Sequence, residues 1–325
     1  MKTYASAPSE EMKLPTIQES VMNYVRLARI DHWFKNIFML PGFFLAVILA
    51  DVSIGEVWIP SVVGLLSVCF IASANYVLNE WLDAPFDKFH PKKKHRPSAA
   101  GLVKGPLVYL EYAILAVIGL SLALELTDEF VILASVLLVM GLIYNVPPLR
   151  SKDRVFLDVL TESVNNPLRL LLGWSALVGG VLPPSSIILA YWMGGAFLMT
   201  VKRLAEYRLI DDPSRAALYR RSFSSYSELK LLLASFFYAL SSAFFLGIFL
   251  VKYRIEFLLS FPLFALLFVW YLAIGMRPDS PAQTPEKLYR ETGFVTYTVF
   301  LGVAVLVLFF VDIPWLLILT DSVEY

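Results

Sequence analysis

Apolar residues along this chain are gathered into long runs, and most polar residues lie in the shorter stretches between them. A transmembrane helix needs roughly 20 mostly apolar residues, and nine stretches approach that length. They are residues 34–51, 58–81, 106–126, 129–146, 158–178, 184–203, 229–251, 256–275 and 294–318. The pattern therefore predicts an all-α, polytopic membrane protein with about nine transmembrane helices.

The polar start of the chain predicts a disordered cytoplasmic tail over residues 1–20, followed by one transmembrane domain over residues 21–325. Thr16 and Glu19 have the spacing of a capping box, which would start a helix near the end of this tail. Apolar residues recur at helical spacing from Val21 onward. We expect this helix to be amphipathic and to lie along the bilayer surface.

Composition supports the membrane assignment. Of the 325 residues, 58% are hydrophobic and 17% are charged, whereas soluble domains are typically about 45 to 50% apolar even with glycine included. The single cysteine, Cys69, excludes an intrachain disulfide and a cysteine metal cluster. No nucleic-acid partner is expected.

The positive charges predict the orientation. With the N-terminus placed in the cytoplasm, nearly all Lys and Arg residues fall in the tail and loops of that side. The exceptions are Lys252 and Arg254 outside and Arg169 within the membrane. Positive loops stay cytoplasmic, so we expect the candidate motifs to face the cytoplasm, in the cell inner membrane.

The stretch from Asn75 to Pro97 begins in an apolar run and ends in a basic loop. Asn79 and Asp83 are four residues apart and share a helix face. Asp87 would extend this stripe, but Pro85 is expected to end the helix first. Such a row could be a solvated loop that caps a transmembrane helix.

The same row could instead hold a metal ion. Oxygen ligands suit a hard cation, and Mg²⁺ is usually held by one or two carboxylates together with substrate phosphates. The cations that follow, Lys93 and Arg96, would bind phosphate oxygens. Asn79, Asp83 and Asp87 are therefore the candidate Mg²⁺ ligands.

This stretch resembles the first aspartate-rich motif of the UbiA superfamily of intramembrane prenyltransferases, which reads Asn-Asp-x-x-Asp-x-x-x-Asp before a basic segment ending in Arg-Pro. The residues that match are Asn79, Asp83, Asp87, Lys93, Arg96, Pro97 and Gly101. Glu80 stands where the family usually has Asp, so its longer side chain leaves a direct metal role in doubt.

Two further segments carry cations beside the expected helices. Arg29-Ile-Asp-His-Trp-Phe-Lys35-Asn36 is similar to the family's Arg-Pro-x-x-Trp-x-Lys-Asn opening, although its Trp could serve only as an interfacial anchor. Tyr144-Asn-Val-Pro-Pro-Leu-Arg150-Ser-Lys152 is similar to the family's Tyr-x-x-Pro-Pro-x-Arg-x-Lys segment, although its cations could be topological markers alone. The resemblance implies pyrophosphate contacts from Arg29, Lys35, Tyr144, Arg150 and Lys152.

Arg169 lies within an expected transmembrane helix. An arginine at that depth is a functional candidate by default, with Glu162 or Asn165 as its expected partner. A structural salt bridge between helices is the alternative. The family has an arginine at a similar place.

Lys202, Arg203 and Glu206 end the sixth expected helix. Enzymes of the superfamily that use a prenyl diphosphate usually carry a second aspartate-rich motif here, and this chain lacks it. Lys-Arg-x-x-Glu instead resembles the decaprenyl-phosphate phosphoribosyltransferase branch. The Pro-Pro-x-Arg-x-Lys loop resembles the ordinary prenyltransferases more closely.

The resemblance implies a Mg²⁺-dependent transferase that releases diphosphate, with Asp83, Asp87, Lys35 and Lys152 in catalytic roles. The favoured chemistry moves a phosphoribosyl group from phosphoribosyl diphosphate to a polyprenyl phosphate. In the alternative, a prenyl diphosphate alkylates an aromatic or other acceptor. The phosphate-binding set implied is Arg29, Lys35, Lys93, Arg96, Tyr144, Arg150, Lys152, Arg169, Lys202 and Arg203. A transporter would also place Arg169 and Glu162 in the membrane, but it would not need the acidic row beside a cationic loop.

Overall fold

The computed structural model describes residues 16–210, 213–283 and 285–319, and these residues are arranged as helices and connecting loops. The α-helices are α1 (Ile17–Leu27), α2 (Leu40–Leu49), α3 (Ile54–Asp87), α4 (Gly105–Ala123), α5 (Asp128–Asn145), α6 (Leu157–Ser163), α7 (Asn165–Ser175), α8 (Ser185–Ile210), α9 (Pro213–Tyr219), α10 (Glu228–Tyr253), α11 (Phe261–Gly275) and α12 (Thr292–Phe310). The 3-10 helices are η1 (Ile30–Met39), η2 (Lys93–His95), η3 (Ser151–Asp153), η4 (Arg221–Ser224), η5 (Ile255–Ser260), η6 (Pro281–Gln283), η7 (Pro285–Arg290) and η8 (Pro314–Leu319).

Eight helical stretches of the described chain are long and apolar enough to cross a membrane. This confirms the all-α, multi-pass architecture, with eight spans where about nine were expected. The expected span 158–178 is divided into α6 and α7 at Val164. Pro167 supplies no N–H to the carbonyl of Ser163, four residues earlier, and so weakens a continuous helix at this point.

The first expected span also differs from the prediction. Residues 30–39 form the 3-10 helix η1, and α2 begins only at Leu40. At the other end of the chain, α12 stops at Phe310 rather than continuing to 318. Asp312 and Pro314 follow directly, and proline cannot donate the hydrogen bond that would extend the helix.

The N-terminal helix has the predicted capping box. Thr16 Oγ1 accepts a hydrogen bond from the backbone N–H of Glu19, and the Glu19 carboxylate accepts one from the backbone N–H of Thr16. Val21 and Val25 of α1 are exposed, whereas Leu27 is fully buried. The amphipathic pattern is therefore present. Residues 1–15 of the expected disordered tail lie outside the described residues, and α1 begins before residue 20.

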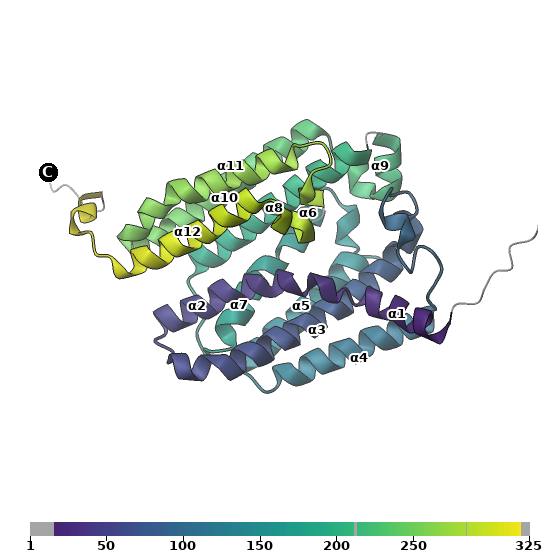
Figure 1. Cartoon of the computed structure of the whole chain (residues 1–325), viewed down its shortest axis with the longest axis horizontal. Helices are drawn as coiled ribbons and strands as arrows, with labels where there is room; N and C mark the ends of the chain where they lie inside the picture. The colour runs from purple at the N-terminus through teal and green to yellow at the C-terminus, as the bar shows by residue number, and fades with distance from the viewer. Residues whose placement is uncertain (1–15, 211–212, 284, 320–325) are drawn as a thin grey trace, which may run out of the picture.

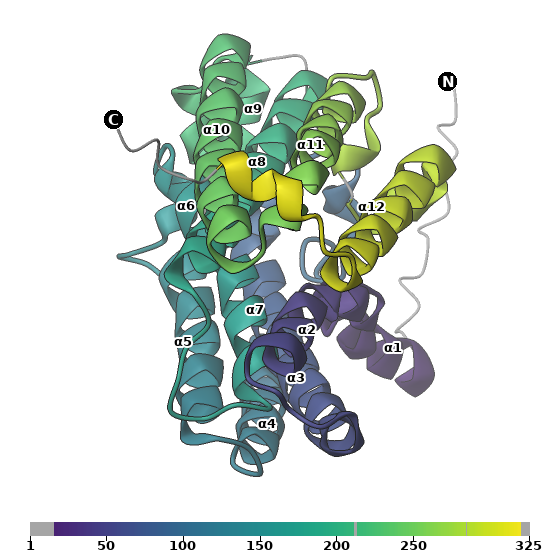
Figure 2. The same ribbon diagram turned by 90° about the vertical axis from the view of Figure 1, so that its left-hand side faces the viewer.

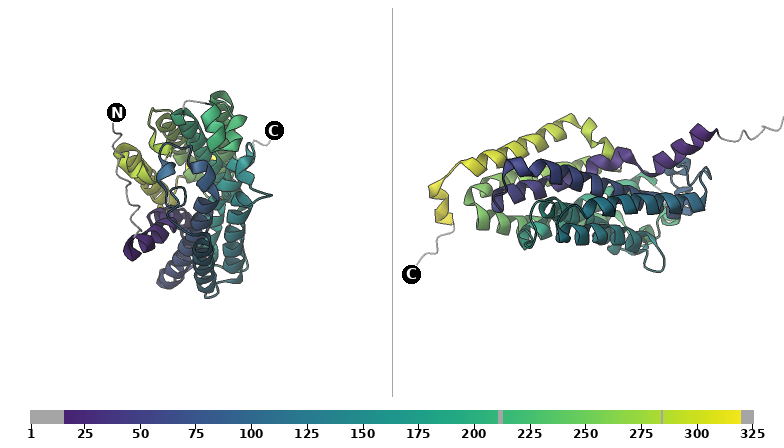
Figure 3. Two further views of the ribbon diagram at one scale, coloured as in Figure 1. Left: turned by 90° about the vertical axis from the view of Figure 1, so that its right-hand side faces the viewer. Right: turned by 90° about the horizontal axis from the view of Figure 1, so that it is seen from below.

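The helices form two halves along one long axis (Figures 1 and 3). Helices α1–α5 and α7 make one half, and α8, α10, α11 and α12 make the other (Figures 1 and 2). In the first half α3 packs on α4 and α5, and in the second α8 packs on α10. Helices α6 and α7 both contact α8 and thereby connect the halves.

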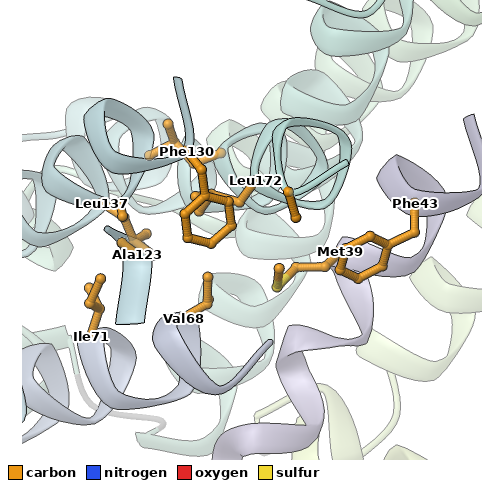
Figure 4. Close-up of a cluster of buried hydrophobic side chains, with 11 residues drawn as sticks. Met39, Phe43, Val68, Ile71, Ala123, Phe130, Leu137 and Leu172 are labelled. Carbon is orange, nitrogen blue, oxygen red and sulfur yellow. The ribbon is translucent and has the colours of Figure 1, made fainter. Parts of the chain in front are cut away.

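Each half has its own apolar core. In the first, Met39 and Phe43 pack with Val68, Phe130 and Leu172 across η1, α2, α3, α5 and α7 (Figure 4). In the second, Val159, Phe197, Val201, Tyr238 and Tyr271 are among the buried residues that pack together. These cores fix the positions of the helix ends that carry polar residues.

Helices α2 and α7 cross at very short range because glycine lies on both. A Cβ atom at Gly42 would collide with the backbone carbonyl of Leu170, and one at Gly173 would collide with the carbonyl of Met39. The crossing brings η1, just before α2, against the start of α7.

Candidate active site

The C-terminal end of α3 carries the acidic row. Helix α3 continues through Pro85 to Asp87, so the expectation that Pro85 ends the helix is wrong. The lost hydrogen bond falls in the last turn, where a helix is least dependent on it. Asn79, Asp83 and Asp87 therefore belong to one continuous helix and follow one another at intervals of four residues.

Asp83 is the centre of a cationic group from the loop that follows α5. Its Oδ1 is 3.0 Å from Nη2 of Arg150 and 2.5 Å from Nζ of Lys152. Asn79 donates to Asp83 Oδ2 over 3.2 Å. The side-chain oxygen of Asn145 accepts from Asn79 over 2.5 Å and from Lys152 over 2.7 Å. Two helices and a loop thus converge on one carboxylate.

Lys152 is buried, with 3% of its side chain exposed. Burial lowers the pKa of its ammonium group to about 8, and Asp83 opposes this shift. A lysine with this pKa is mostly charged at neutral pH and is close to losing its proton.

Asp87 pairs with the basic loop rather than with Asp83. Its Oδ2 is 2.7 Å from Nη1 of Arg96. Lys93 Nζ bonds the Tyr219 hydroxyl and lies 3.1 Å from Oε1 of Glu206. Burial opposes the charge of Lys93, but Glu206 and Tyr219 outweigh it and raise the pKa of this lysine.

His90 fixes the start of the same loop. Its Nδ1 accepts the backbone N–H groups of Lys92 and Lys93, and its ring meets the Tyr219 ring edge-on at 4.7 Å. Burial, followed by the charge of Lys93, lowers the pKa of His90 to about 3. The ring is therefore neutral at physiological pH and can accept both bonds.

Arg203 of α8 holds together a buried ionic network. It is 1% exposed, and its nitrogens lie 3.3 Å from Asp158, 2.5 Å from Glu162 and 2.9 Å from Glu206. The Tyr144 hydroxyl donates to Glu162 over 2.6 Å and accepts from Arg203 over 3.1 Å. Arg203 and Tyr144 thus bond protein groups in this structure.

A small cavity lies between the Asp83 group and the loop residues that face it. It has a volume of about 20 Å³, which is room for about one water molecule. Its lining residues are Asp83, Phe86, Asp87, Arg150, Lys152, Asp153, Tyr219 and Arg220. The two aspartates and the Arg150–Lys152 pair therefore share one space.

Arg220 and Tyr219 were given no role from the sequence. Arg220 reaches the Tyr144 hydroxyl over 3.2 Å and lies 3.8 Å from Asp158. Burial opposes the positive charge of Arg220. The nearby Tyr144, Tyr219, Glu206 and Asp158 outweigh this effect and raise the pKa of Arg220 well above its ordinary value. The available signal was the pair Arg220-Arg221 in the long loop after α8. Charge alone could not distinguish Arg220, which lines the cavity, from the other arginines of this loop.

Of the predicted phosphate-binding cations, only Arg150 and Lys152 line this cavity. Lys93, Arg96 and Arg203 pair with the carboxylates described above, and the remaining four have other partners. Arg29 pairs with Glu80 at 2.8 Å, and Lys35 contacts His32 Nδ1 at 3.1 Å. Lys202 lies 4.0 Å from Glu162. Arg169 donates to the side-chain oxygen of Asn36 and to the backbone carbonyl of Asn165. Glu162, one expected partner of Arg169, instead bonds Arg203 and Tyr144.

Comparison with known proteins places this architecture in a family. Residues 38–291 match the family model described as the UbiA prenyltransferase family. The chain belongs to this family. Membership supports a transferase embedded in the membrane, in agreement with the eight apolar spans.

Named relatives within the family act on different substrates. The chain is 30% identical to decaprenyl-phosphate phosphoribosyltransferase of Mycobacterium tuberculosis over 228 residues, 68% of this chain and 71% of that protein. It is 26% identical to 4-hydroxybenzoate octaprenyltransferase of Yersinia pseudotuberculosis over 202 residues, 62% of this chain and 66% of that protein. A UbiA homolog from Archaeoglobus fulgidus, solved with DMAPP and Mg²⁺ bound, has the same fold, with a TM-score of 0.67 and 20% identity. That match covers 89% of this chain and all of the homolog.

The residues of the cavity fit Mg²⁺ in their chemistry. Asp83 and Asp87 both line it, and Mg²⁺ is usually held by one or two carboxylates together with water or substrate phosphates. Among the described residues no three His, Cys, Asp or Glu side chains form a metal-binding group. A metal here would therefore take its remaining ligands from Asn79, from water or from a substrate phosphate. Glu80 bonds Arg29 and does not line the cavity.

Proposed function

We propose that this UbiA-family protein transfers a 5-phosphoribosyl group from phosphoribosyl diphosphate to a polyprenyl phosphate and releases diphosphate. The leaving diphosphate would occupy the place between α3 and the loop after α5, where the cavity now has room for about one water molecule. This place would widen as Arg150 and Lys152 turn away from Asp83. The C–O bond to diphosphate breaks, and a phosphate oxygen of the lipid forms the new bond to the ribosyl C1.

The observation that carries this proposal is a buried ion pair near the C-terminal end of α8. Arg203 and Glu206 bond each other there at 2.9 Å and are both buried. The resemblance to prenyl diphosphate enzymes would call for a second row of aspartates near this position. Glu206 is instead neutralised by Arg203 and Lys93, which supports a donor held by a single acidic row.

The cavity residues would have distinct roles. Asp83 and Asp87, with Asn79 beside them, would hold Mg²⁺, which supplies charge neutralisation to the departing diphosphate. Arg150, Lys152 and Arg220 would turn from their carboxylates to the phosphate oxygens and stabilise the developing negative charge. Lys93 and Arg96 would approach the same oxygens from the basic loop. The network around Arg203 would hold α6 and α8 in place.

Sequence similarity supports the same choice, since 30% identity to a phosphoribosyltransferase extends over 68% of the chain. The alternative is prenyl transfer from a prenyl diphosphate to an aromatic acceptor. It is favoured by the Pro147-Pro148-x-Arg150-x-Lys152 loop and by the similarity to 4-hydroxybenzoate octaprenyltransferase.

The test uses the purified full chain with Mg²⁺ in two parallel assays. One contains labelled phosphoribosyl diphosphate and polyprenyl phosphate, and the other contains labelled prenyl diphosphate and aromatic acceptors. Labelled lipid product in the first assay, lost when a chelator removes Mg²⁺, is the expected result. Product in the second assay alone would establish prenyl transfer. Product in neither assay, together with transport in liposomes, would show that the protein is a transporter and not an enzyme.

A further inference from the structure

Arg169 of α7 is a deeply buried cation whose hydrogen-bond partners are neutral. Only 8% of its surface is exposed. Its Nε donates to Asn36 Oδ1 over 2.9 Å, and its Nη1 donates to the Asn165 carbonyl over 3.1 Å. Within the described residues no carboxylate pairs with this guanidinium. Arg203 is also buried but contacts three carboxylates.

A buried arginine within a membrane is expensive when no negative charge compensates it. Two neutral oxygens satisfy some of its five N–H donors, but they do not neutralise it. An anionic ligand would supply the missing charge.

A second cation lies in the same region. Lys202 of α8 is 4.0 Å from Glu162, its nearest carboxylate partner. That carboxylate is held more closely by Arg203, at 2.5 Å, and by the Tyr144 hydroxyl, at 2.6 Å. Glu162 is thus largely committed elsewhere. Lys202 lies on α8, which packs against α7, the helix of Arg169.

Tyr76 of α3 lies beside two further cations, both at η1. Arg29 and Lys35 stand over its ring at 5.7 and 5.8 Å. Helix α7, which carries Arg169, contacts both η1 and α8, and α8 carries Lys202. We call Arg29, Lys35, Tyr76, Arg169 and Lys202 the inner basic cluster. It shares no residue with the lining of the Asp83 cavity.

The surroundings of the cluster favour a lipid anion over a soluble one. Asn36, which bonds Arg169, is 1% exposed, whereas Phe34 and Ile37 on the same short helix are 49% and 59% exposed. Helix η1 thus has a buried side with Asn36, which contacts Arg169, and an exposed apolar side with Phe34 and Ile37. A ligand with a charged head and an apolar chain would fit this arrangement, with its head at the buried cations and its chain along the exposed apolar side of η1.

We propose that the inner basic cluster binds the phosphomonoester head group of the polyprenyl acceptor, while the Asp83 cavity takes the diphosphate donor. This inference rests on the proposed function and divides its site into two separate anion sites. A phosphomonoester carries a charge of about −1.5 to −2 at neutral pH, which matches Arg169 and Lys202 together. A carboxylate would match only one of them.

The test is Asn36→Asp, which places a carboxylate on the Arg169 guanidinium without changing the size of the side chain. This internal anion competes with the lipid phosphate. We expect the KM for polyprenyl phosphate to rise at least about tenfold and the KM for phosphoribosyl diphosphate to stay within about twofold. Arg169→Gln should change the two constants in the same way. Arg254→Gln, which removes an arginine paired with Asp312, is the matched control and should change neither.

A purely structural role for Arg169 gives a different result. A carboxylate at residue 36 would then strengthen the contact between η1 and α7, raise the thermal unfolding temperature in detergent and leave both KM values unchanged. That result would overturn the inference, as would equal increases in both constants.

A binding assay separates failure of this inference from failure of the proposed function. Wild-type and Asn36→Asp proteins are titrated with farnesyl phosphate, farnesol and 4-hydroxybenzoate. Loss of farnesyl phosphate binding alone in Asn36→Asp supports the cluster, even if the wild-type protein transfers no phosphoribosyl group. Unchanged farnesyl phosphate binding, or loss of 4-hydroxybenzoate binding alone, rejects it.

Discussion

At the scale of single residues, the carboxylates and cations of the Asp83 cavity neutralise one another. Asp83 is held by Arg150 and Lys152, and Asp87 is held by Arg96. Removing one member leaves a buried charge without its partner, which is costly. An informative substitution must therefore remove charge while it keeps size and hydrogen bonding.

Asp83→Asn and Asp87→Asn meet this requirement. Each should lower kcat by at least about 100-fold, because a metal ligand and its charge are lost from the place where diphosphate would leave. The protein should remain folded in detergent, as size-exclusion chromatography would show. Asp312→Asn is the control, since Asp312 is 84% exposed and pairs with Arg254 away from the cavity. Wild-type turnover in both variants would remove the metal assignment.

At the scale of elements, the crossing of α2 and α7 positions Asn36 beside Arg169. It sets η1, with Asn36, against α7, with Arg169. The break at Val164 lets α6 and α7 follow separate directions, and Glu162 and Asp158 of α6 can then reach Arg203 of α8.

Gly173→Ala should separate α2 from α7. The added Cβ would collide with the backbone carbonyl of Met39, and such overpacking typically costs about 1–3 kcal/mol. Thermal unfolding in detergent measures this cost. Gly247→Ala on α10 is the matched control, because a Cβ there meets nothing within 4 Å and alanine stabilises a helix interior by about 0.5–1 kcal/mol. Equal stability of the two variants would contradict the close crossing.

At the scale of the whole molecule, the polar residues of the cavity come from segments distant in sequence that meet at one end of the bundle. The loop from α3 to α4 and helix α9 lie at the same end (Figure 1), and α3 contacts α9 while η3 contacts η4. The positive loops predict that this end faces the cytoplasm.

Orientation can be tested with introduced cysteines. Cys69 is 3% exposed, so it should give little background labelling. Lys94 and Asp312 are both exposed, and each would be replaced by cysteine in a separate variant. A membrane-impermeant thiol reagent added to intact cells should label the Asp312→Cys protein and spare the Lys94→Cys protein until the membrane is opened. The reverse pattern would invert the predicted topology.

The sequence by itself determined the approximate limits of most spans, because a chain in lipid must satisfy its backbone hydrogen bonds within helices. The resemblance of its motifs to those of the UbiA superfamily also implied that Asp83, Asp87, Arg150 and Lys152 belong to one candidate site. Tertiary structure decided which side chains each buried cation pairs with. Arg203 meets Asp158 and Glu162, whereas Arg169 meets Asn36. These partners lie 41 to 133 residues apart, so their pairing depends on how helices cross and not on any local periodicity.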